Sequence, residues 1–172
     1  MSVFDRILNW EPFSRTRRNH ALEHATLQVL AEKNSRLRLA GYSDPRGFWL
    51  LGQIETDQVE DGVRQALTRL QSGEHRLAIH PNCGTNLVTS GLMAGVFAWL
   101  GMQGVGRNAR DRVERLPLVI TLVTLAMVLS QPLGPMVQER VTTSPAAQGM
   151  EILRIERLQR GDVPLHRVLI RF

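Results

Sequence analysis

Two short motifs contain most of the residues in this chain that could bind a metal ion. The first is His20-Ala-Leu-Glu23-His24, in which three residues separate the two histidines. On a helix, residues four apart lie on one face, so both imidazoles could bind a single ion with Glu23 beside them. The inverted zinc-peptidase motif H-x-x-E-H has this pattern, with two histidines as zinc ligands and the glutamate as general base. Alone, the motif is a weak signal, because so short a pattern arises by chance.

The second motif is His80-Pro-Asn-Cys83, in which a turn brings an imidazole and a thiol together. The chain has five histidines and one cysteine, so the two motifs contain three of its histidines and its single cysteine. Four nitrogen and sulfur ligands are what a tetrahedral zinc site requires. The sequence therefore predicts a zinc site formed by His20, His24, His80 and Cys83.

Simpler roles for these residues stay open at this point. His20 could be an exposed residue near a helix start, and His24 a hydrogen-bonded histidine of the core. Cys83 could be a small buried residue that precedes a helix. His75 and His166 have no companions in the sequence, and we expect ordinary surface or sheet positions for them.

Taken together, the His20–His24 motif and the run His80-Pro-Asn-Cys-Gly-Thr-Asn86 resemble the paired signatures of a family of small bacterial membrane proteins of unknown function. They are also similar to elements of YqhQ-type proteins, which are regarded as metal-dependent membrane proteins. The resemblance covers roughly residues 19–106. It implies a metal site and a membrane setting, and it implies no particular reaction or substrate.

Two long uncharged segments follow the second motif. No Asp, Glu, Lys or Arg occurs between Arg76 and Arg107, and residues 116–138 are also uncharged. Residues 87–106 would form a helix of about 30 Å, which matches the hydrocarbon thickness of a bilayer. The alternative is a pair of buried helices in a soluble core, but the remaining chain is too short to cover them. The sequence therefore predicts a transmembrane hairpin of two helices.

The remaining segments predict an α+β fold, in which a small mixed sheet packs with two helices. We expect helices at 19–33 and about 57–70, strands at 38–43, 48–54 and 76–80, and a C-terminal hairpin of strands at 151–157 and 165–172 that joins the sheet. The expected domains are an N-terminal α+β domain at 1–86 with the metal site, the transmembrane hairpin at 87–138, and a C-terminal linker and β-hairpin at 139–172.

Charge and cysteine content bear on partners and location. The formal net charge is +5, and many arginines lie near the apolar segments, which favours anionic lipid over nucleic acid as a partner. A single cysteine excludes a disulfide within the chain. The N-terminus lacks the pattern of a secretory signal, so we expect a multi-pass protein of the cell membrane with its soluble parts in the cytoplasm. Arginines in the loop between the spans argue for the opposite sidedness: Arg107, Arg110, Arg112 and Arg115.

Three functions are consistent with these residues. The first is a membrane-anchored zinc protein in which the metal is structural and the chain serves a membrane assembly with other membrane subunits. The second is a membrane-bound zinc hydrolase of the peptidase type, with Glu23 as general base. The third is a cysteine-dependent enzyme, with Cys83 as nucleophile and His80 or His24 as base.

Overall fold

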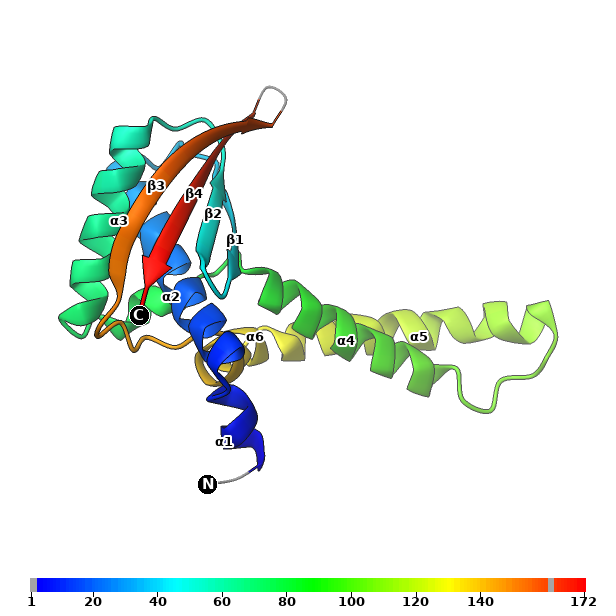
Figure 1. The fold of residues 1–172 in the computed structure, drawn as a ribbon. Helices are drawn as coiled ribbons and strands as arrows, with labels where there is room; N and C mark the ends of the chain where they lie inside the picture. The colour runs from blue at the N-terminus through cyan, green and yellow to red at the C-terminus, as the bar shows by residue number, and fades with distance from the viewer. Residues whose placement is uncertain (1–2, 161–162) are drawn as a thin grey trace. The chain divides into compact units, whose positions relative to one another are not determined.

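The computed structural model describes residues 3–160 and 163–172. The chain forms two compact units, one made of residues 1–80 and 139–172 and the other of residues 81–138. The strands that the structure describes all belong to the first unit, together with helices α1, α2 and α3 (Figure 1). The second unit is therefore an insertion between two parts of the first.

Antiparallel strands form the sheet of the first unit, in the order β1-β2-β4-β3. They are β1 (Ala40–Asp44), β2 (Gly47–Leu51), β3 (Glu151–Arg160) and β4 (Val163–Arg171). β2 pairs with β4, so the C-terminal hairpin joins the N-terminal one in a single sheet. The α+β class is confirmed. The expectation of a mixed sheet is wrong, because every strand pairing is antiparallel.

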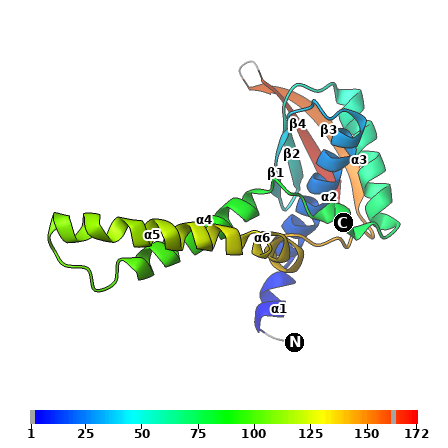
Figure 2. The same cartoon turned by 180° about the vertical axis from the view of Figure 1, so that it is seen from behind.

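Two long helices cover one face of this sheet, as Figure 2 shows from behind. They are α2 (Glu11–Lys33) and α3 (Thr56–Gln71), and the short α1 (Val3–Leu8) precedes α2. The core lies between the helices and the sheet. Its members alternate along the strands and recur at helical spacing: Leu22, Val29, Leu30, Phe48, Leu50, Val59, Val63, Ala66, Leu70, Val168 and Ile170.

The strand expected at residues 76–80 is instead a short 3-10 helix, η1 (His75–Ala78). The backbone acceptors of this segment are bound by side chains of α2 and not by a neighbouring strand. Gln28 Nε2 donates to the carbonyls of Leu77, at 2.8 Å, and Ile79, at 3.1 Å. A segment whose carbonyls are satisfied in this way has no need of a sheet ladder.

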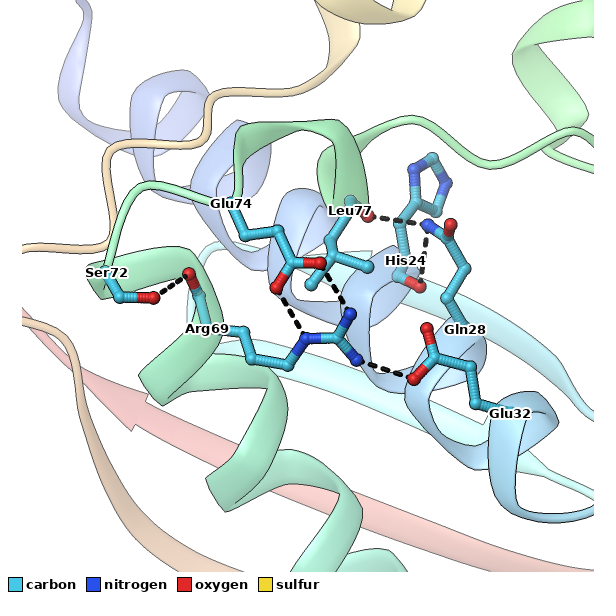
Figure 3. A network of polar contacts seen from close by, with 7 residues as sticks. All are labelled: His24, Gln28, Glu32, Arg69, Ser72, Glu74 and Leu77. Atoms are coloured by element: carbon cyan, nitrogen blue, oxygen red, sulfur yellow. Dashed lines mark hydrogen bonds and ion pairs between the residues drawn. The ribbon is translucent and has the colours of Figure 1, made fainter.

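Charged side chains hold the same segment to both helices (Figure 3). Arg69 on α3 donates to Glu74, just before η1, and to Glu32 on α2 at 2.6 Å. The hydrogen bond from Arg69 lowers the pKa of the Glu74 carboxyl below its usual value. Because the two carboxylates are about half exposed, these ion pairs fix the position of the segment and add little to the free energy of unfolding.

The second unit is a pair of helices that lie side by side and run in opposite directions (Figures 1 and 2). They are α4 (Gly84–Gly101) and α5 (Ala109–Ser130), and the short α6 (Leu133–Val137) follows α5 in the same unit. The π-helical turn η2 (Gln138–Thr142) then leads the chain back into the first unit. Polar side chains join the helices at one end. Ser90 and Ser130 share a hydrogen bond of 2.7 Å, and Gln138 Nε2 donates to Asn86 Oδ1 at 2.6 Å.

Within the described residues, one helix, α5, is long and apolar enough to cross a membrane, and this is weak evidence for a membrane location. The predicted hairpin of two spans, and with it a multi-pass protein, is therefore not supported. α4 has only 18 residues, and its first two turns carry Thr85, Asn86, Thr89 and Ser90. These polar residues shorten its continuous apolar stretch below the length of a span.

His166 on β4 generates a prediction about pH. Its side chain is fully buried, and burial lowers its pKa below the ordinary value, with the nearby Arg157 cation lowering it further. The unfolded chain therefore binds a proton near pH 6.5 that the folded chain binds only at lower pH. We expect the free energy of unfolding to fall as pH drops below 6.5, by up to about 1.4 kcal/mol per pH unit from this group. Urea unfolding of the full chain in detergent between pH 8 and pH 5 measures this.

The variant His166→Gln should flatten that pH dependence, because glutamine does not titrate. His75→Gln is the matched control, since His75 is exposed, and it should leave the pH dependence unchanged. Equal pH dependence in the wild type and in His166→Gln would contradict the assignment.

Candidate metal centre

The histidines of the first motif lie on one face of α2, as their spacing predicts. The rings of His20 and His24 have their centroids 4.2 Å apart. His24 is buried and His20 is partly buried. Helix α2 begins at Glu11, well before the expected start, because Arg17 and Arg18 donate to carbonyls of residues 140–148 and anchor its first turns.

Backbone carbonyls hold both imidazole rings in place. His24 Nδ1 lies 2.7 Å from the Ala78 carbonyl oxygen, and His20 Nδ1 lies 2.9 Å from that of Thr142. A carbonyl only accepts, so each Nδ1 must carry the proton, and each Nε2 then presents a lone pair. Metal-binding histidines are usually oriented in this way by a hydrogen bond on the other ring nitrogen.

His80 follows η1 and lies near the same rings. Its centroid is 5.5 Å from that of His24. The Gln28 contacts with Leu77 and Ile79 hold the segment that leads into it. Gln28 is one turn beyond His24 on α2, so the two side chains lie on the same face of the helix. Sequence reasoning missed Gln28, although that spacing could have identified it.

Cys83 is the N-cap of α4 and is largely buried. Its Sγ accepts a hydrogen bond from the Thr85 N–H at 3.4 Å. The candidate ligand atoms of His20, His24 and Cys83 all lie within 4.8 Å of one another, so this group could hold a metal ion. Three of the four predicted ligands thus form one group. His80 lies beside this group, with its ring near that of His24.

Glu23, the predicted general base, makes contacts with the sheet. Its side chain is buried, and its Oε2 accepts a hydrogen bond from Ser43 on β1 at 2.5 Å. The carboxylate also lies directly over Gly41, where an added Cβ would meet Oε1 at 2.1 Å. Gly41 is therefore required for this close approach. A glycine inside a strand is the signal that could have pointed to it.

A cavity of about 350 Å³ lies in the first unit beside the segment that holds His24. Ala78, whose carbonyl binds His24, lines it, and so does Thr143, next to the residue that binds His20. Its other lining side chains include charged groups, Arg76 and Glu139. The backbone segments that bind the two imidazoles therefore also line a cavity that a small polar molecule could enter.

Comparison with known proteins places the chain in a family. Residues 15–155 match the family model described as Domain of unknown function (DUF6391). An uncharacterised protein of Picosynechococcus sp. (strain ATCC 27264 / PCC 7002 / PR-6) is 34% identical over 171 residues, which cover 91% of this chain and 79% of the relative. No solved structure matches the chain. Because the family model covers most of α2, both motifs and the helical unit, the chain belongs to the DUF6391 family.

Proposed function

We propose that this protein is a membrane-anchored zinc protein in which the metal has a structural role, and that it serves as an accessory component of a membrane assembly. The observation that carries the proposal is the grouping of His20, His24 and Cys83, with both imidazoles oriented by backbone carbonyls. Imidazole and thiolate donors select zinc over Mg²⁺ and Ca²⁺, which prefer oxygen ligands.

A structural role is supported by the surroundings of the ligands. His80 would complete four nitrogen and sulfur donors, and a site with four protein ligands leaves no position for a reacting water. Glu23 is engaged by Ser43 and packed on Gly41. A carboxylate held in this way stabilises the docking of α2 on β1, and that role needs no catalysis.

Anchoring in a membrane is supported by the second unit. α5 has a mean hydropathy of 1.8 over its most apolar stretch. Many apolar side chains of α4 and α5 are exposed: Leu87, Val88, Leu92, Val96, Trp99, Leu100, Val113, Leu116, Leu118, Ile120, Leu125, Met127, Val128 and Leu129. So much exposed apolar surface marks a lipid or protein contact. The proposed partners are the bilayer and other membrane subunits.

One observation favours a second candidate, a membrane-bound zinc hydrolase of the peptidase type. The group of mutually close ligand atoms contains three residues, and three protein ligands with one open position are typical of catalytic zinc. Zinc at such a site lowers the pKa of a bound water. In this alternative, Glu23 would serve as the general base for that water, and the cavity beside Ala78 would admit the substrate.

The metal content of the purified protein tests both candidates. We expect the full chain, purified in detergent without a histidine tag, to contain about one zinc ion per chain when its metal content is measured by inductively coupled plasma mass spectrometry. The double variant His24→Ala, Cys83→Ser should lose the metal, because it removes two of the grouped ligands. His75→Ala is the control and should retain it. A wild type that contains no metal would overturn both candidates.

A structural metal should also contribute to stability. Zinc at a thousandfold excess over its Kd stabilises the folded chain by about 4 kcal/mol. We therefore expect a strong chelator to lower the Tm of the wild type by roughly 10 °C, and added zinc to restore it. The Cys83→Ser variant should start at the lower Tm and respond little to the chelator. If the chelator removes zinc and the Tm does not move, the structural role is wrong.

Glu23→Gln separates the structural and catalytic candidates. Glutamine keeps an oxygen for the Ser43 hydrogen bond but cannot accept a proton as a base. The structural proposal predicts unchanged zinc content and unchanged function of the assembly in cells. The hydrolase alternative predicts unchanged zinc content with loss of peptide hydrolysis by at least about a hundredfold. Glu32→Gln, an exposed change on the same helix, is the control.

A further inference from the structure

The face of the sheet that points away from α2 and α3 has its own pattern of side chains. Along β2 and β4, residues of this face alternate with core residues such as Phe48 and Val168. The strand register places Tyr42 opposite Trp49, and Trp49 opposite Arg167. The outer face therefore presents two aromatic rings and a guanidinium in one row across three strands.

The next positions along the strands extend this row with apolar residues. Leu51 on β2 pairs with Leu165 on β4, and Leu165 pairs with Leu158 on β3. A groove of about 620 Å³ lies here, lined by Tyr42, Trp49, Leu51, Val163 and Leu165. Its volume is in the range of small-molecule sites, and its lining is apolar and aromatic as in such sites.

A second cavity, of about 470 Å³, adjoins the groove through Trp49, which lines both. Its lining is charged: Asp44, Pro45, Arg46, Trp49, Arg167 and Leu169. Two arginines against one aspartate leave a net charge of +1. Burial raises the pKa of Asp44, but hydrogen bonds from Arg167 and from the Arg46 N–H hold it below its usual value, so the carboxyl stays ionised.

Arg167 is a buried cation with hydrogen-bonding capacity to spare. Only 6% of the residue is exposed, and Nη2 donates to Asp44 Oδ1 at 2.8 Å. The guanidinium lies over the Trp49 ring, 4.7 Å from its centroid. Among the residues that the structure describes, its Nη1 has no hydrogen-bond partner. A buried guanidinium nitrogen normally has an acceptor, and a ligand anion would supply one.

We propose that this face binds a long-chain carboxylate, with its hydrocarbon chain in the groove of Tyr42, Trp49 and Leu165 and its carboxylate at Arg46 and Arg167. The positively charged cavity would receive the carboxylate, and the apolar groove would receive the hydrocarbon chain. A peptide fits less well, because most of the groove is lined by β2 and β4, which pair with strands on both sides and leave no backbone ladder for a peptide. The site lies on the opposite face of the sheet from α2, so it does not rest on the proposed zinc function.

The test uses a dibrominated stearate, whose bromine atoms quench tryptophan fluorescence on contact. Changing Trp10 and Trp99 to phenylalanine in the full chain leaves Trp49 as the single reporter. In detergent, we expect saturable quenching of Trp49 by the acid and at least about threefold weaker quenching by its methyl ester, which partitions into micelles but carries no charge. Equal quenching by acid and ester would overturn the proposal, because it would reflect apolar partitioning alone.

Two exposed variants locate the ligand. Arg46→Gln should raise the half-saturating concentration of the acid about tenfold, because it removes a charged hydrogen-bond donor at the head of the site. Tyr42→Ser should weaken binding of acid and ester alike by removing apolar contact. Arg36→Gln, an exposed arginine outside both cavities, is the matched control and should change nothing. If Arg36→Gln weakens binding as much as Arg46→Gln, the effect is general charge attraction and the proposed site is wrong.

Discussion

The candidate metal centre depends on the hydrogen bonds that α2 makes to the segment after α3. His24 binds the carbonyl of Ala78, and Gln28 binds those of Leu77 and Ile79. These bonds satisfy backbone acceptors in a part of the chain that joins no sheet. An unpaired buried acceptor costs on the order of 1–3 kcal/mol, so the segment has a strong preference for this position. The position of His80 follows from it, because His80 comes directly after the bound carbonyls.

The same turn of α2 is engaged on its other side by the sheet. Glu23 points to β1, where Ser43 donates to it and Gly41 leaves room for it. A buried carboxylate is costly unless hydrogen bonds compensate its loss of water. Adjacent residues of one helix thus contact different parts of the unit, Glu23 the sheet and His24 the η1 segment. The orientation of the two imidazoles is therefore coupled to the packing of the whole α+β unit.

Apolar surface is used differently in the two units. In the first, α2 and α3 bury their apolar faces against the sheet, and arginines such as Arg17 and Arg69 bind carbonyls or carboxylates at its edges. In the second, apolar side chains of α4 and α5 point outward, while Ser90 and Ser130 meet inside. Polar contacts between helices with apolar exteriors are typical of packing in lipid. The proposed membrane setting rests on this contrast together with the length and apolar composition of α5.

The sequence alone determined the local features: helix α3, the two hairpins, and the two motifs with their ligand types. The spacing of apolar residues in α3 and the positions of its ends depend only on residues near them in the chain. The sequence could not determine features that depend on partners distant along the chain. α2 starts at Glu11 because its arginines bind carbonyls after residue 139, and residues 75–78 form η1 because α2 takes their acceptors. The contacts of Glu23 likewise depend on Gly41 and Ser43 on β1. Spacing on one helix predicts which side chains share a face, but only tertiary packing decides what each of them meets.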